Sequence, residues 1–176
     1  FNLTWVHPLA VRRDPLLGAL HSRGRHFSEP EKHALLDRHL DILREIIPLV
    51  SGSVTPNREV RLGVKLSLKR GLDFVVNEES HHRADPVRVG ELQIWDVVNK
   101  TRMDHPFHLH GFFFQVLDVN GEPPAFRSWE DTVNVPPKGR VRIAFLPDDR
   151  PGEWMYHCHI LEHHAGGMMA HFEVIR

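Results

Sequence analysis

The residues of this chain that could carry chemistry are concentrated in two short segments rich in histidine. The first reads HPFHLHG over residues 105–111, and the second reads HCHILEHHAGGMM over residues 157–169. The second contains Cys158, the only cysteine of the sequence, so no disulfide can form within the chain. Imidazole, thiolate and thioether groups are ligands of transition metals. The two segments therefore predict a metal site.

The alternation of side chains along a strand sorts these ligands into two groups. Neighbouring residues of a strand face opposite sides, so Cys158 points away from the histidines on either side of it. His105 lies an odd three residues before His108 and can face away from it, with Pro106 bending the path. If the two segments pair side by side, one group consists of His108, His110, His157 and His159. The other consists of His105 and Cys158, joined by His163 from the turn after the second segment, with Met168 beyond it.

The group that contains the thiolate matches one kind of metal site. Two imidazoles and a thiolate in a plane, with a weak thioether on the axis, form a blue-copper centre that transfers single electrons. The four-imidazole group has too few ligands to fill a multi-copper cluster and would make half of one. Because Cys158 lies directly between His157 and His159, an electron at its sulfur has a short covalent path to either imidazole. The sequence therefore predicts electron transfer from the site that contains Cys158 to the site formed by the four imidazoles.

A zinc-peptidase motif overlaps the second segment. His159-Ile-Leu-Glu162-His163 matches the HxxEH pattern of inverzincins, whose two histidines must share one face of a helix. The sequence before it is strand-like, and Gly166 and Gly167 follow almost at once. The motif also leaves Cys158 unexplained, so we reject this interpretation.

Alternating apolar residues predict an all-β fold for most of the chain. Apolar residues occupy every second position from Val60 to Leu68, which is typical of a half-buried strand. Further strands are predicted at residues 72–76, 91–99, 112–119, 140–146, 153–159 and 169–175. Turn signals such as Asn120-Gly121 and residues 136–139 separate them. Many short strands at this spacing favour a β-sandwich or a Greek-key barrel.

Residues 1–57 differ in composition from the rest of the chain. A capping box over residues 28–31, followed by apolar residues at helical spacing, predicts one helix over about residues 29–47. We expect residues 1–57 to form a lead or linker and residues 58–176 to form the metal-binding domain. The chain begins at Phe1 without an initiator methionine or a signal segment, so we expect a fragment, a processed product or a piece of a larger polypeptide.

Composition excludes several classes of partner. With 41% hydrophobic and 26% charged residues, the 176-residue chain has the balance of a soluble globular protein. Its 22 basic and 23 acidic residues give a net charge of −1, so nothing suggests a nucleic-acid or anionic-lipid surface. No apolar run approaches the length of a membrane span. Asn99-Lys-Thr101 matches a glycosylation sequon, which is a weak signal.

The two histidine segments resemble the C-terminal copper-binding motifs of the multicopper oxidases, a family that includes the laccases. The resemblance runs from about Phe74 to Arg176 and includes WEDTVNVPPKGRVRIAF at 129–145 and PGEWMYHCH at 151–159. It implies a cupredoxin-like Greek-key β-sandwich, the third domain of such an enzyme. The ligands that it implies for type 1 copper are His105, Cys158 and His163, with Met168 axial. For type 2 copper it implies His108, and for the type 3 pair His110, His157 and His159.

The resemblance also implies a reaction and its partners. Single electrons from a reducing substrate, a phenol-like compound or a metal ion, would enter at type 1 copper and pass through the His-Cys-His motif to a trinuclear copper cluster that reduces O2 to water. The remaining histidines of that cluster come from two HxH motifs on another cupredoxin domain, in the same polypeptide or another subunit. Because members of this family are commonly exported, the resemblance further implies that the protein is periplasmic or secreted.

Two alternatives accompany this prediction. Several bacterial relatives carry a glutamate, thought to deliver protons, where this chain has His164, so His164 is a candidate proton shuttle beside the copper ligands. The alternative function is a blue-copper electron-transfer domain without O2 chemistry. That domain would need only the thiolate group, and the four imidazoles of the other group argue against it.

Overall fold

The computed structural model describes residues 28, 30, 33, 49–50, 52–67 and 71–176. The elements below all belong to one compact unit formed by residues 48–125 and 129–176. The helix predicted over about residues 29–47, and Leu68 at the end of the first predicted strand, lie outside the described residues except at single positions. Among the helices that are described, none has the length and apolarity needed to cross a membrane.

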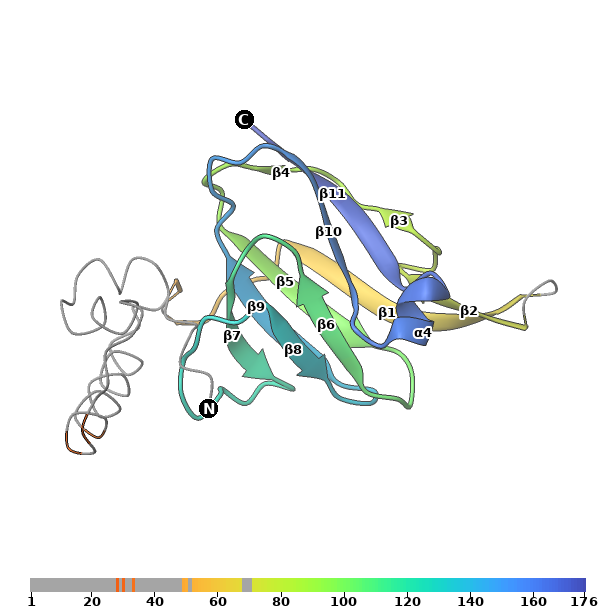
Figure 1. Ribbon diagram of the computed structural model, residues 1–176, viewed down its shortest axis with the longest axis horizontal. Helices are drawn as coiled ribbons and strands as arrows, with labels where there is room; N and C mark the ends of the chain where they lie inside the picture. Colours follow the sequence, from red (N-terminus) through yellow and green to blue (C-terminus); the bar gives the residue numbers. More distant parts are fainter. Residues whose placement is uncertain (1–27, 29, 31–32, 34–48, 51, 68–70) are drawn as a thin grey trace. The chain divides into compact units, whose positions relative to one another are not determined.

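The strands form two mixed sheets (Figure 1). The first sheet has the order β2 (Gly71–Val76), β1 (Arg58–Ser67), β5 (Gln93–Asn99), β9 (Arg140–Phe145), β7 (Phe114–Val119). The second has the order β3 (His82–Arg83), β11 (Met169–Ile175), β10 (Gly152–Cys158), β6 (His105–Leu109), β8 (Thr132–Val135), and β4 (Val87–Arg88) also pairs with β11. From β5 to β10, successive strands alternate between the two sheets, so the predicted all-β sandwich is confirmed.

Most of the predicted strands are present, but two expectations were wrong. Each of the six strands predicted from residue 72 onward forms, with ends that differ by no more than two residues. Leu66, however, is 85% exposed rather than half-buried. The pairing of β1 with β5 ends at Leu62, and β1 continues as a two-stranded ribbon with β2, which carries Leu66 into solvent. The predicted turn after β10 is a short helix, α4 (Leu161–Ala165).

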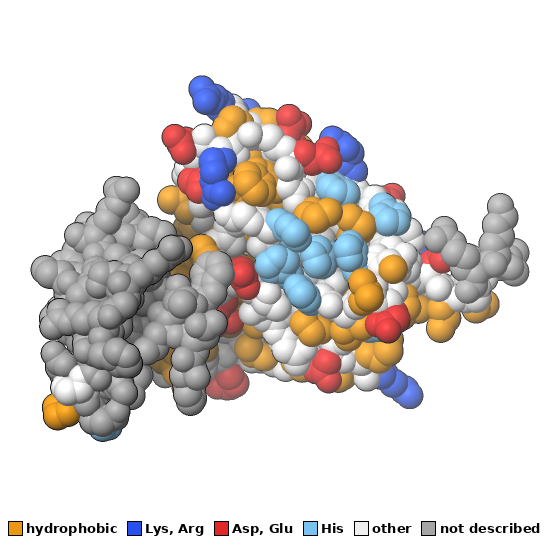
Figure 2. All heavy atoms as spheres, viewed as in Figure 1, with side chains coloured by type: hydrophobic (Ala, Val, Ile, Leu, Met, Phe, Trp, Pro, Cys, Tyr) orange, Lys and Arg blue, Asp and Glu red, His pale blue; other side chains and the backbone are white. Residues whose placement is uncertain are grey.

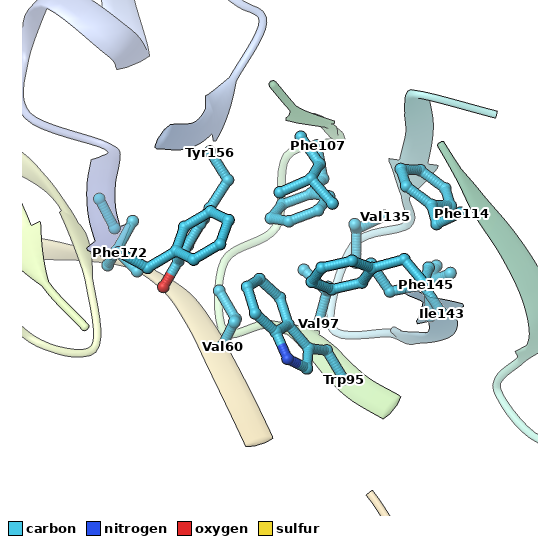
Figure 3. Packing of buried hydrophobic residues seen from close by; sticks show 14 of the residues in the cluster. Val60, Trp95, Val97, Phe107, Phe114, Val135, Ile143, Phe145, Tyr156 and Phe172 are labelled. Atoms are coloured by element: carbon cyan, nitrogen blue, oxygen red, sulfur yellow. The ribbon is translucent and has the colours of Figure 1, made fainter. Parts of the chain in front are cut away.

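The core between the sheets is centred on aromatic rings (Figure 3). Trp95 of β5 is fully buried and meets three other rings edge-on: Phe145, Tyr156 and Phe172, at centroid distances of 4.8, 5.3 and 5.6 Å. Phe145 belongs to the first sheet, whereas Tyr156 and Phe172 belong to the second, so Trp95 packs across both sheets. The same core cluster includes Cys158 and Met168, so these two candidate ligands lie within the hydrophobic core.

A charged cluster holds three strands of the first sheet together. The carboxylate of Asp96 on β5 accepts hydrogen bonds from Arg142 Nε and Nη2 at 2.7 and 2.9 Å and from Arg140 Nη1 at 2.8 Å. Arg140 also pairs with Asp118 on β7. Burial alone would raise the pKa of Asp96, but the hydrogen bonds from Arg142 and Arg140 outweigh it, so the pKa lies below its usual range.

We predict that Asp96→Asn lowers the free energy of unfolding by about 2–3 kcal/mol at pH 7, because hydrogen bonds to a charged partner are lost. The folded-state pKa of Asp96 is below its unfolded value of about 3.9, so the stabilisation is complete above that pH and is lost as pH falls through the folded pKa. Denaturant unfolding from pH 7 down to pH 3 should show the difference between variant and parent shrinking with acid.

The control for this prediction is Glu59→Gln. Glu59 pairs with Arg61 at 3.6 Å, and both side chains are about half exposed, so its loss should cost less than about 0.5 kcal/mol. If Asp96→Asn lowered the free energy of unfolding by the same amount over the whole pH range, the lowered pKa of Asp96 would be contradicted.

Candidate metal centres

The register between β6 and β10 positions the candidate ligands. The two strands pair antiparallel, with His157 opposite His108 and Cys158 opposite Phe107. Burial alternates along β6, where His105 and Phe107 are buried and His108 is half-buried. Pro106 does not bend the path as expected: β6 continues through it, and alternation alone turns His105 inward. Side chains on one face of this strand pair therefore point into the core, and those on the other face point outward.

Three candidate ligand atoms form a small triangle on the inner face. His105 Nδ1 and His163 Nδ1 lie 3.1 Å apart, and the sulfur of Cys158 lies 3.6 Å from the first and 3.5 Å from the second. His105 and Cys158 are fully buried, and His163 is 7% exposed. The point equidistant from the three atoms is about 2 Å from each, which is the length of a metal–nitrogen bond. The triangle has the size and the donor set for a copper ion.

His163 reaches this triangle from α4. Its ring stacks on Phe74 of β2 with the centroids 4.1 Å apart. The close approach of Phe74 depends on Gly166, since a Cβ there would lie 2.8 Å from the Phe74 ring. Met168 N donates to the carbonyl of His163 at 2.9 Å, and Cys158 N donates to the carbonyl of Met168 at 3.1 Å. Met168 is thereby tied to two of the three ligands, and its side chain is fully buried in the core.

Four more imidazoles lie on the outer face of the same strands, where histidine side chains gather in a patch (Figure 2). His110 Nε2 and His157 Nε2 are 2.9 Å apart. His108 and these two histidines place one nitrogen each within 4.8 Å of one another. His159 is exposed, and its ring centre lies 5.4 Å from that of His108 and 5.7 Å from that of His157.

Hydrogen bonds at Nδ1 orient two of the outer histidine rings, those of His108 and His157. His108 Nδ1 lies 2.9 Å from both the carbonyl oxygen of Asp131 and the hydroxyl of Thr132. His157 Nδ1 lies 2.8 Å from the carbonyl oxygen of Cys158. Because a carbonyl only accepts, each Nδ1 donates and each Nε2 keeps its lone pair. Both rings therefore present Nε2 as the nitrogen that could bind a metal.

The predicted proton shuttle lies beside this group. His164 on α4 is half-buried, and its ring stacks on that of His157 with centroids 4.4 Å apart and an interplanar angle of 16°. The structure thus brings His164 next to a candidate ligand, and its role in proton transfer stays a prediction.

Burial favours the uncharged form of the candidate ligands. Burial, followed by the neighbouring His163, lowers the pKa of His105 to about 4. Burial also lowers the pKa of His157 to about 4, and it lowers the pKa values of His110 and His163. The pKa of the Cys158 thiol is raised by burial. At neutral pH the imidazoles are free to bind a metal, whereas the thiol must release a proton when a metal binds.

Several residues that shape these sites carry no local sequence signal. Phe74 is separated from His163 by 89 positions in the printed sequence, so their stacking depends on the fold. Asn99 is 1% exposed, so its side chain is buried and the sequon at 99–101 does not mark a glycan site. Thr101, two residues on, lies 2.7 Å from His105 Nε2.

Comparison with known proteins agrees with the motifs. Residues 56–176 match the family model described as "Multicopper oxidase", which is more than half of the chain. The chain belongs to the multicopper oxidase family. Its cupredoxin-like β-sandwich, predicted from the resemblance, is confirmed by solved relatives of that fold.

Individual relatives of this multicopper oxidase chain are about three to four times as long as the part that matches. A multicopper oxidase of Staphylococcus aureus is 31% identical over 146 residues, which cover 74% of this chain and 32% of the relative. A laccase of Bacillus subtilis is 33% identical over 125 residues, covering 57% and 24%. The solved multicopper oxidase of Campylobacter jejuni, titled a metallo-oxidase, has a TM-score of 0.61 at 31% identity, covering 72% and 32%. The chain spans about a quarter to a third of these relatives.

The end of β6 gives a test of how this multicopper oxidase chain holds His110. Gly111 has φ +79°, and a Cβ added there would overlap the ring of Trp154. We predict that Gly111→Ala costs about 2–4 kcal/mol of unfolding free energy, from backbone strain and overpacking together. Thermal or denaturant unfolding measures the loss.

Gly121→Ala is the matched control. Gly121 also has a positive φ, +94°, but a Cβ there meets nothing within 4 Å, so only the backbone cost of about 1 kcal/mol remains. Equal losses for the two variants would show that Trp154 does not press on Gly111.

Proposed function

We propose that this chain is the third cupredoxin domain of a laccase-like multicopper oxidase. In this proposal, the inner and outer groups of ligands would hold copper, which would supply single-electron transfer from a reducing substrate to O2, with four electrons and four protons for each O2 reduced to water. One observation carries the proposal. The buried triangle of His105, Cys158 and His163 and the outer histidine group are joined through a single residue, because Cys158 of the inner group directly precedes and follows histidines of the outer group.

The buried ligands of the inner triangle would have a different role from the more exposed histidines of the outer group. The inner triangle is buried, and the packed core around it would hold its nitrogen and sulfur donors in place when the charge at the site changes. Met168 would supply the weak axial thioether, which its full burial and its backbone bonds beside Cys158 and His163 support. His163 is the ligand of this group nearest to solvent, so we propose that electrons enter beside it.

The outer group would form half of a trinuclear copper cluster. We assign His108 to type 2 copper and His110, His157 and His159 to the type 3 pair. The half-buried rings of His108 and His110 and the exposed ring of His159 are accessible to a partner surface. Because the chain spans about a third of the S. aureus relative, we propose that another cupredoxin domain supplies the remaining histidines. Export to the periplasm or by secretion, and a phenol-like or metal-ion substrate, belong to the same proposal.

The alternative is a blue-copper electron-transfer domain without O2 reduction. Such a domain would use the inner triangle alone. The 2.9 Å approach of His110 Nε2 to His157 Nε2, and the orientation of the His108 and His157 rings with Nε2 free, argue for a second metal site. Copper stoichiometry of the assembled protein decides between the two: one copper per chain supports the carrier, and about four support the oxidase.

We predict that Cys158→Ser abolishes both the intense visible absorption of thiolate-bound Cu(II) and the turnover of reducing substrates, because the thiolate is the ligand that gives the absorption and begins the electron path. Optical spectroscopy and oxygen consumption on the copper-loaded, assembled protein measure the two effects.

The matched control for Cys158→Ser is His108→Gln, in the outer group. It should keep the visible absorption and lose turnover, since only the inner triangle contains sulfur. Visible absorption that survives Cys158→Ser would refute the ligand assignment.

A second prediction concerns the axial position. Met168→Leu should keep the metal and raise the reduction potential of the inner site, because loss of a thioether donor destabilises Cu(II) relative to Cu(I). Redox titration of the visible absorption gives the potential. Met169→Leu, at the adjacent buried residue, should leave the potential unchanged, and a lower potential for Met168→Leu would count against axial ligation.

A further inference from the structure

The nitrogen of His105 that points away from the triangle lies in a closed network of hydrogen bonds. Its Nε2 is 2.7 Å from the hydroxyl of Thr101, and that hydroxyl is 2.9 Å from Asn99 Oδ1. All three side chains are buried: Asn99 is 1% exposed, Thr101 8% and His105 0%. Buried networks of this kind fix the position of every proton, because each donor must meet an acceptor.

The orientation of the Asn99 amide follows from its neighbours. Its Nδ2 faces three backbone carbonyl oxygens, those of Met103 at 2.7 Å, Val135 at 3.1 Å and Pro136 at 3.0 Å. Carbonyls only accept, so the group that faces them must be the amide NH2. Asn99 Oδ1 is therefore the atom that faces Thr101, where it accepts from the backbone N–H at 2.8 Å.

The single hydroxyl proton of Thr101 is then accounted for. Asn99 Oδ1 is an acceptor 2.9 Å away, so the hydroxyl donates to it. A second acceptor near this hydroxyl, the backbone carbonyl of Met103, is 3.3 Å away and already receives a bond from Asn99 Nδ2. When the hydroxyl donates to either oxygen, its lone pairs are left for the N–H of Met103, 3.2 Å away, and for His105 Nε2, and Nε2 then carries the proton. The lone pair of His105 is consequently at Nδ1, the atom that faces Cys158 and His163.

We propose that Thr101, held by Asn99, is a positioning residue that fixes the tautomer and the ring orientation of His105, so that the ring presents a bare Nδ1 to copper. This inference rests on the proposed type 1 site. The same network is anchored to the turn between β8 and β9, because Asn99 N donates to the carbonyl of Gly139 and Lys138 N donates to that of Thr101. The position of His105 is therefore coupled to a segment more than thirty residues away in sequence.

Fixing the tautomer matters because the alternative, with the proton on Nδ1, would oppose metal binding. A proton on Nδ1 would lie inside the triangle, facing His163 Nδ1, whose nitrogen is 3.1 Å from that of His105. It would have to leave before a metal could bind. Outer partners that set the tautomer of a histidine ligand typically change metal affinity by about 10–100-fold. Without the hydroxyl, the buried Nε2–H would also lack its acceptor.

The first test needs no variant and no metal. Nitrogen NMR of the full, metal-free chain with labelled histidine distinguishes the two tautomers of His105. The proposal predicts a protonated Nε2 and a bare Nδ1 near neutral pH, and a ring protonated on Nδ1 would overturn it. Because the chain carries no copper in this experiment, the result is independent of the proposed oxidase function.

The second test compares Thr101→Val with Thr101→Ser. Valine keeps the branched shape without the hydroxyl, so the Nε2–H tautomer should lose its dominance, copper affinity should fall by about 10–100-fold, and the reduction potential of the inner site should rise as the ligand becomes less basic. Serine keeps the hydroxyl and should restore all three to near the parent values. Parent-like tautomer, affinity and potential in a folded Thr101→Val protein would overturn the proposal.

Thr132→Val controls for the loss of a threonine hydroxyl beside a candidate histidine ligand, since Thr132 is half-buried. Thr132 contacts His108 on the outer face, so this variant should leave the His105 tautomer and the visible absorption of the inner site unchanged. An equal effect of Thr132→Val and Thr101→Val on the inner site would show a general structural disturbance and would overturn the specific role of Thr101.

Discussion

The pairing register of β6 with β10 is the constraint on which both candidate metal sites depend. With His157 opposite His108 and Cys158 opposite Phe107, the sulfur is turned into the core and its histidine neighbours are turned outward. A shift of one residue would exchange the two faces of a strand. The register is secured from both sides, because β10 also pairs with β11 along six residue pairs, and β6 with β8 along four. Sheet geometry therefore places His105, His108, His157 and Cys158, and the other candidate ligands lie just beyond these strands or on α4.

Two different chemical environments arise from this one strand pair. The inner triangle is part of the hydrophobic core, where burial keeps the histidines neutral and raises the pKa of the Cys158 thiol. The outer group lies on a surface of graded exposure, from the buried His157 through the half-buried His108 and His110 to the exposed His159. A core position suits electron transfer with little rearrangement, and an open surface suits a site that another domain completes. Both follow because successive side chains of β10 face opposite sides of the sheet.

The sequence predicted most of the strands and the two ligand groups, because both depend on a period of two. It did not predict β3, β4, β6 and β8, which are short. It could not predict the exposure of Leu66, since that depends on where the pairing of β1 with β5 ends. Helix α4 is five residues long and follows Ile160, whose side chain cannot cap a helix, so it carried no start signal. The contacts of Phe74 with His163 and of Asn99 with Pro136 join distant parts of the chain, and only the fold reveals them.

The central claim is that one cysteine sulfur holds a copper ion on one side of β10 while the adjacent histidines hold copper on the other. A crystal structure of the assembled, copper-loaded protein, with anomalous scattering recorded at the copper edge, tests this most directly. The account predicts one copper peak bonded to Cys158, His105 and His163, and separate copper peaks at His108, His110, His157 and His159. Copper absent from the sulfur, zinc in its place, or outer histidines turned to bulk solvent would contradict it.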